Sequence, residues 1–235
     1  MPRELLLFSA GLDSFPAWHY LGRPRVFYAD LSHRYRQAEL AAICMLERRW
    51  KMDLTVSDEL DMSAWQTDDV IIPMRNLYLA TLASRHADTI WCVGVKGDDT
   101  LDKSPDAFAA MSHALTRFSG RTIRIDSPFW QMTKTEIVAW YLREGLPVDD
   151  LLLTYSCTEN PRVHCGACPS CLRRWIALAN NGITTGRFAT DPWRWERVTT
   201  YYIDAMRNGR YPDHRAHEFF DALATVGITA EPNPA

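Results

Sequence analysis

The 235-residue sequence has no excess of charge of either sign: 26 lysines and arginines accompany 29 aspartates and glutamates, a formal net charge of −3. This balance argues against binding nucleic acid through bulk electrostatic attraction, although it leaves room for a local basic patch. The sequence has no run of about 18 apolar residues, so a membrane-spanning helix is not expected. It also lacks internal repeats and low-complexity tracts, which leaves an ordinary globular protein.

Several familiar signals are missing as well. Gly11 stands alone and no lysine follows it, so neither the Walker loop nor the dinucleotide fingerprint is present. The first four residues lead directly into an apolar run without room for a signal peptide, so we expect a cytoplasmic protein. In that reducing compartment the six cysteines are not expected to form disulfides. Cys44 and Cys92 lie in apolar runs and are predicted to be buried packing residues.

The order of apolar segments predicts an α/β fold. A buried strand at 5–8 precedes a turn and a helix from about Asp13. Alternating strands and helices imply a parallel sheet with helices on both faces. Residues 58–72 are expected to form an exposed acidic loop, and 231–235 a disordered tail. The remaining predicted strands are 25–31, 53–57, 89–95 and 122–125, and the remaining predicted helices are 37–50, 74–87, 106–118, 133–143, 172–180, 197–207 and 214–225.

The stretch from Ser9 to Ser14 joins the first predicted strand to the first helix. A turn of small residues at this place directs free backbone N–H groups and the positive end of a helix toward one point, where an anion can sit. Gly11 lets the backbone approach a ligand closely, and Ser9 and Ser14 add hydroxyl donors. The turn therefore predicts a phosphate site, with plain α/β scaffolding as the competing interpretation.

Four cysteines near the C-terminal third have the spacing Cys-x7-Cys-x2-Cys-x2-Cys. Two-residue gaps let one turn offer successive thiolates to a single ion, which is typical of tetrahedral zinc. An iron–sulfur cluster is the main alternative. Four thiolates leave zinc no open position, so we assign the site no catalytic role, and we interpret His164 as a bystander. The ligands are Cys157, Cys165, Cys168 and Cys171.

Several motifs then occur in one order: Ser-Ala-Gly-Leu-Asp-Ser at 9–14, Pro73-Met74-Arg75-Asn76, Ser127-Pro128 with Lys134, Thr154-Tyr155-Ser156-Cys157, and the cysteine trio with Arg174. This series resembles the 7-cyano-7-deazaguanine synthase family of the ATP pyrophosphatases, over about 5–183. The resemblance implies a Rossmann-like adenine nucleotide α hydrolase fold with a structural zinc site, and a homodimer. It also implies an enzyme that activates 7-carboxy-7-deazaguanine with ATP, adds ammonia to give an amide, and dehydrates the amide to the nitrile with more ATP.

The resemblance divides the chain into three parts and assigns roles to residues. Residues 1–145 form the ATP pyrophosphatase domain, 146–190 the zinc-binding segment with its helix, and 191–235 an additional helical segment. Asp13, Arg75 and Lys134 are the implied catalytic residues, with Asp13 reaching Mg²⁺ and the two cations neutralising the polyphosphate. The implied pyrophosphate cradle is Ser9, Ala10, Gly11, Leu12, Asp13 and Ser14, and the implied substrate residues are Asn76, Asp99 and Asp106.

Each role has a plainer alternative. Taken alone, Arg75 is also explained as a surface residue early in a helix, and Lys134 as a solvated first-turn residue; their place in the ordered motif series favours the site roles. Glu39 follows the second strand where the family has a glutamate, and a salt-bridge role explains it as well as a site role. A carboxylate that accepts from the N1–H and amino group of a guanine-like ring would explain Asp106. A cap or first-turn acid of the following helix would explain it too.

The sequence departs from the family pattern mainly around the substrate. Ala10 replaces the first glycine of the turn, and Met74 replaces the glycine before Arg75. The family's Tyr-Pro-Asp-Cys is Ser104-Pro105-Asp106-Ala107 here, in a loop that is one residue longer. The aromatic residues of 191–235, a segment beyond the family's usual length, are expected to pack together or form an interface.

Three function classes follow. The first is the ligase of this family, which makes the nitrile, stops at the amide, or joins the deazaguanine acid to an amine of a macromolecular partner. The second is a related pyrophosphatase acting on another acceptor, as in tRNA thiolation or amidation. The third is a non-catalytic zinc-bearing interaction module.

Overall fold

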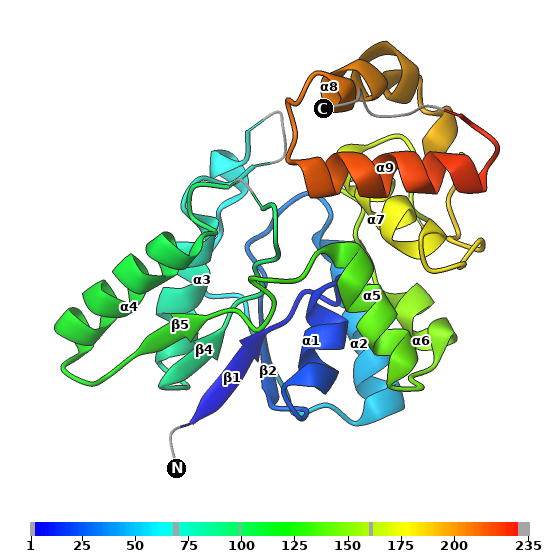
Figure 1. Ribbon diagram of the computed structural model, residues 1–235. Helices are drawn as coiled ribbons and strands as arrows, with labels where there is room; N and C mark the ends of the chain where they lie inside the picture. Colours follow the sequence, from blue (N-terminus) through cyan, green and yellow to red (C-terminus); the bar gives the residue numbers. More distant parts are fainter. Residues whose placement is uncertain (1–2, 68–70, 99, 160–161, 230–235) are drawn as a thin grey trace.

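A computed structural model describes residues 3–67, 71–98, 100–159 and 162–229 (Figure 1). Its centre is a five-stranded parallel sheet with the order β3-β2-β1-β4-β5. Because β1 is central and the chain leaves it in both directions, the carboxyl ends of β1 and β4 form the switch point at which open α/β sheets bind ligands. The strands are β1 (Glu4–Leu7), β2 (Arg25–Ala29), β3 (Leu54–Ser57), β4 (Thr89–Trp91) and β5 (Arg124–Asp126).

Helices cover both faces of the sheet, as the alternation of segments predicted. Alternate residues of β1 point to opposite faces, so Leu6 packs in one core cluster and Leu5 and Leu7 in the other. The first face is covered by α1 (Ser14–Tyr20), α2 (Arg36–Trp50), α5 (Lys134–Arg143) and α6 (Val148–Leu153). The second is covered by α3 (Arg75–Ser84) and α4 (Pro105–Ser119).

Local capping signals fix where two helices begin. The Thr133 side chain accepts a hydrogen bond from the Glu136 N–H, and the Glu136 side chain accepts from the Thr133 N–H, so the capping box starts α5 as predicted. At α7 (Pro169–Ala179) the Cys168 sulfur is the cap, since it accepts a hydrogen bond from the Cys171 N–H. Helix α7 begins at Pro169, three residues before the predicted start at 172. Proline is favoured at the first position of a helix, because its fixed φ suits the helix and its missing N–H is not needed there.

Three expectations are wrong or incomplete. Cys44 is exposed, since the buried face of α2 is formed by Ala42, Ile43 and Leu46 and position 44 falls out of phase with it. The 58–72 segment is more than an exposed loop, because it contains a short 3₁₀ helix at Ser63–Trp65 and buries Met62 and Ile72. Helix α6 was not foreseen.

The C-terminal segment adds a third hydrophobic cluster on α7. It contains a 3₁₀ turn (Pro192–Arg194), a π-helical turn, η3 (Val198–Tyr202), then α8 (Ile203–Arg207) and α9 (Asp213–Thr225). The helices predicted at 197–207 and 214–225 are thus confirmed, and the aromatic residues do pack together. Figure 1 shows α9 lying against α7. The predicted disordered tail, 231–235, lies outside the described residues.

None of the helices in the described ranges has both the length and the hydropathy required to cross a bilayer.

Candidate active site

The turn from Ser9 to Ser14 lies at the carboxyl end of β1 and leads into α1. The Gly11 N–H donates to the Ser14 hydroxyl at 3.0 Å, and the Gly11 carbonyl accepts from the Phe15 N–H at 3.2 Å. The Ala10 carbonyl accepts from the Tyr155 N–H at 2.8 Å, which ties the turn to the segment that carries Cys157. These bonds hold the turn in one shape before any ligand binds.

Two positions keep a glycine-like backbone without a glycine. Ala10 has φ +50° and Met74 has φ +57°, both in the left-handed region that favours glycine. These are the two places where the chain departs from the glycines of the resembled family. The backbone shape of the turn and of the α3 start is therefore kept despite the substitutions.

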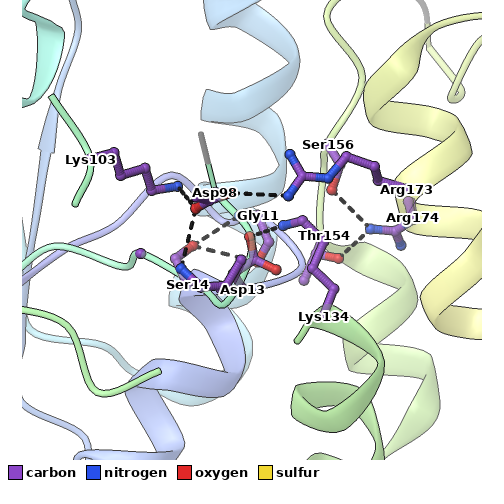
Figure 2. Close-up of polar contacts among 12 residues, drawn as sticks. Gly11, Asp13, Ser14, Asp98, Lys103, Lys134, Thr154, Ser156, Arg173 and Arg174 are labelled. Atoms are coloured by element: carbon purple, nitrogen blue, oxygen red, sulfur yellow. Dashed lines mark hydrogen bonds and ion pairs between the residues drawn. The ribbon is translucent and has the colours of Figure 1, made fainter. Parts of the chain in front are cut away.

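The first residue of α5 reaches the turn: Lys134 forms an ion pair with Asp13 (Figure 2). Burial lowers the pKa of Lys134, and the Asp13 carboxylate opposes that effect. The second oxygen of Asp13, Oδ1, is buried and has no hydrogen-bond partner among the described residues. One carboxylate oxygen is thus held by the lysine while the other is left available.

A second charged group, missed by the sequence interpretation, lies beside the first. Asp98 accepts from Lys103 and Arg173, each at 2.9 Å (Figure 2). Burial alone would raise the pKa of the Asp98 carboxyl, but the cations around it, Lys103 foremost, hold that pKa well below its usual range. Asp98 therefore stays ionised and orients two cations, Lys103 from its own loop and Arg173 from α7, 75 positions away.

Arg174, next to Arg173 on α7, lies in a different environment. Its side chain is 1% exposed and donates to the Thr154 hydroxyl at 2.7 Å and to the Leu151 carbonyl at 3.3 Å. The guanidinium thus joins α7 to the residues after α6. We interpret it as a positioning residue for the Tyr155 segment that supports the turn.

The predicted cation Arg75 begins α3 and faces the same space. Its guanidinium donates to the Tyr35 hydroxyl at 3.2 Å. Glu39 accepts from the Tyr28 hydroxyl at 3.2 Å and contacts His33 Nε2 at 3.1 Å. Glu39 thus pairs with His33 in a largely buried polar network, and it also lines the cavities described below, so the salt-bridge role has support and the site role stays a prediction.

Three adjoining cavities surround these groups. The strand-end cavity, of about 160 Å³, is lined by apolar residues of β1 and β2 and by Asn76. The central cavity, of about 190 Å³, lies between the turn and Arg173. The C-terminal cavity, of about 320 Å³, lies between α7, α9 and the start of α5. The strand-end and central cavities have these lining residues in common: Ser9, Gly11, Asp13, Glu39 and Arg75.

Two of the implied substrate residues, Asn76 and Asp106, are described by the structure, and they do not line a common cavity. Asn76 is buried in the strand-end cavity. Asp106 is exposed in the first turn of α4 and lines none of the three cavities. Ser104, and not Asp106, caps that helix. Asp99 lies outside the described residues, so its role and that of Asp106 stay predictions.

The four predicted cysteine ligands do come together. Their sulfur atoms all lie within 4.8 Å of one another, with Cys157 to Cys168 at 4.0 Å and Cys165 to Cys171 at 3.8 Å. All four are free thiols. His164 is not part of the group, since its Nε2 accepts from the Ser156 N–H at 3.1 Å. The cluster can hold a metal ion.

A glycine makes this cluster possible. Gly166 has φ +79°, and a Cβ at this position would lie 1.8 Å from the Thr190 carbonyl oxygen. Any side chain would therefore push the 190 segment away from the cysteines.

Comparisons with known proteins identify the family of the chain. The model of the family described as queuosine biosynthesis protein QueC matches residues 40–182. A 7-cyano-7-deazaguanine synthase of Marinobacter nauticus is 27% identical over 224 residues, covering 83% of this chain and 97% of the relative. The same-named protein of Hahella chejuensis is 28% identical, covering 84% and 95%. That of Methanothermobacter thermautotrophicus is 33% identical over 121 residues, covering 48% and 53%. The chain belongs to the family of queuosine biosynthesis protein QueC.

Proposed function

We propose that this enzyme converts 7-carboxy-7-deazaguanine to 7-cyano-7-deazaguanine with ATP and ammonia. The relatives are named for that product. The observation that carries the proposal is the Ser9–Ser14 turn with Lys134 and Arg75 beside it at the carboxyl end of the sheet. This arrangement offers oriented donors and positive charge to a polyphosphate.

Two cavities that share a wall suit ATP. The strand-end cavity has apolar walls that include Phe27, Leu31 and Val93, which fit the faces of an adenine ring. The central cavity has hydroxyls and cations, which fit the phosphates. The turn that divides the two cavities then lies beside the pyrophosphate, as the sequence implied.

The reaction needs charge neutralisation and positioning more than a covalent nucleophile. A carboxylate oxygen of the acid bonds to the α-phosphorus, and the bond to pyrophosphate breaks. Ammonia then bonds to the carboxyl carbon, AMP leaves with that oxygen, and a proton is released. In a second round the amide oxygen attacks another ATP, and loss of AMP and two protons gives the nitrile. Lys134, Arg75 and Arg173 offset the negative charge that builds on the leaving pyrophosphate.

Asp13 is the residue we assign to Mg²⁺. Magnesium prefers carboxylate and phosphate oxygens. Asp13 Oδ1, buried without a hydrogen-bond partner in the described part of the chain, fits that requirement. The bound ion would supply further neutralisation of the phosphates, while Lys134 orients the carboxylate through its other oxygen.

We assign a structural Zn²⁺ to the four cysteines. Thiolates about 2.3 Å from one tetrahedral ion lie about 3.8 Å apart, close to the observed sulfur separations of 3.8 and 4.0 Å. An iron–sulfur cluster needs room for several ions between the sulfurs, which a group within 4.8 Å does not offer. The zinc would fix the Tyr155–Cys157 segment that supports the turn, without taking part in the reaction.

Mass spectrometry of a reaction with ATP, Mg²⁺ and 7-carboxy-7-deazaguanine, with and without ammonium, tests the proposal. We expect the nitrile only when ammonium is present. The amide alone would mean that the second activation is missing, and an adenylate that ammonium leaves unchanged would point to a macromolecular amine. Absence of any acid-dependent pyrophosphate release would overturn the proposed function.

A further inference from the structure

The C-terminal cavity is the largest of the three, and apart from Lys134 and Arg173 its lining has no role in the proposed reaction. It lies where α7, α8 and α9 meet the start of α5 and the loop after β4, which contributes Lys96. Its lining is Lys96, Thr133, Lys134, Pro169, Leu172, Arg173, Ile176, Tyr202, Met206, Tyr211, His214, Arg215 and Glu218. A volume of about 320 Å³ suits a small ligand.

The lining combines cations, aromatic rings, a carboxylate and a histidine. Lysine and arginine side chains give it positive charge, and Tyr202 and Tyr211 form a tilted aromatic pair with ring centroids 6.2 Å apart. Among the described residues that line it, Glu218 is the only carboxylate. His214 Nε2 is buried there without a hydrogen-bond partner in the described part of the chain. Such a wall fits a flat aromatic anion that also carries hydrogen-bond donors.

The cavity adjoins the phosphate region. Lys134 and Arg173 line both the C-terminal and the central cavity. A ligand in the first and a polyphosphate in the second therefore contact the same two cations. An anionic group of that ligand, held by these cations, would lie close to the phosphates, which is the juxtaposition that acid activation requires.

The C-terminal segment is fixed in place where it forms this wall. His214 packs so closely on the backbone after β4 that a Cβ on Gly97 would lie 2.7 Å from its Nε2. The Asn180 side-chain amide of the α7 end donates to the Glu218 carbonyl at 2.8 Å. The match to the family model ends at residue 182, so α8 and α9 lie beyond it.

We propose that the C-terminal cavity binds the deazaguanine acid, with its carboxylate toward Lys134 and Arg173 and its ring beside Tyr202 and Tyr211. Glu218 accepts from the N1–H and the amino group of the ring. This inference rests on the proposed function, since it names the place where that substrate binds. It also accounts for the exposed position of Asp106, because the carboxylate that recognises the ring comes from α9.

The test compares Glu218→Gln with Asp221→Asn, an exposed acid on the same helix. The KM for the acid is expected to rise about tenfold or more in Glu218→Gln, with the KM for ATP unchanged, because a charge-assisted hydrogen bond is lost. Asp221→Asn is expected to match the wild type. Thermal melting of both variants checks that the fold is intact.

A substrate analogue that lacks the amino group separates recognition from a structural effect. The wild type is expected to prefer the full acid over this analogue, and Glu218→Gln to lose most of that preference. Equal preference in wild type and variant, or an unchanged KM for the acid, would overturn the inference while leaving the proposed function intact. If the wild type itself makes no product from the acid, the proposed function fails first.

Discussion

Lys134 and Asp13 lie 121 positions apart in the chain and form an ion pair beside the turn that follows β1. The pair joins the first turn of α5 to the N-cap residue of α1. It therefore couples the cation that we propose for the phosphates with the carboxylate that we assign to Mg²⁺.

Removing the lysine charge is the first test of this pair. Lys134→Met is expected to lower kcat for acid-dependent pyrophosphate release by roughly 10²- to 10³-fold, because a charge directed at the leaving group is lost. Lys134→Arg keeps the positive charge but changes its geometry, so its kcat should fall less than that of Lys134→Met. Turnover of Lys134→Met within threefold of the wild type would contradict the assigned role.

The strained backbone at Met74 gives a stability prediction. Its side chain is 51% exposed and its φ is +57°, so Met74→Gly should raise the free energy of unfolding by about 1 kcal/mol in urea denaturation. Ala10→Gly should change the free energy of unfolding less. The relief of its positive φ is offset because Ala10 is fully buried, and losing a buried methyl group costs about 0.8 kcal/mol.

Met45 provides the matched control. It is also exposed, but lies in the interior of α2, so Met45→Gly should destabilise by about 1 kcal/mol. The same substitution is thus expected to have opposite signs at positions 74 and 45. Equal destabilisation at both would show that the left-handed backbone at Met74 is not strained.

The cysteine cluster predicts one zinc ion per chain. Cys157→Ser should lose the metal and lower the melting temperature by roughly 5 °C or more, since a structural zinc ion contributes directly to folding. Cys44→Ser, at an exposed thiol outside the cluster, is the control and should change neither the metal content nor the melting temperature. Metal analysis and melting curves measure both effects. Iron with a visible absorption band would instead support the cluster alternative.

His19 gives a pH dependence. Its ring packs among Phe15, Trp18 and Trp50. Burial, with a smaller effect from the Arg23 charge, lowers its pKa from 6.5 to about 4. Between these two values the unfolded chain binds a proton that the folded chain does not, so stability falls as the pH decreases from about 6.5 to about 4.

The measurement is the free energy of unfolding at several pH values in that range. His19→Gln should flatten the slope, and His113→Gln, at an exposed position, should leave it as in the wild type. Parallel slopes for the wild type and His19→Gln would exclude His19 as the source.

The features that the sequence predicts well in this protein are those set by residues close together in the chain. The capping box of α5, the parallel strands and the spacing of the four cysteines depend on neighbouring residues, and the structure agrees with each. The Ser9–Ser14 turn was found because its small residues follow a buried strand directly.

What the sequence did not reveal depends on long-range contacts. The partnership of Asp98 with Arg173 joins the β4 loop to α7, and no local spacing signals it. The C-terminal cavity arises only when α9 packs on α7. Cys44 was misassigned because an apolar neighbourhood does not tell which face of a helix a residue occupies. The homodimer implied by the resemblance stays a prediction, which sedimentation analysis would decide.

The central claim is that the acid is activated at the α-phosphorus of ATP. The most direct measurement uses 7-carboxy-7-deazaguanine with both carboxyl oxygens labelled with ¹⁸O and follows the label by mass spectrometry. We predict that each AMP formed carries one ¹⁸O and that the nitrile carries none. Label in inorganic phosphate, or AMP without label, would contradict the account.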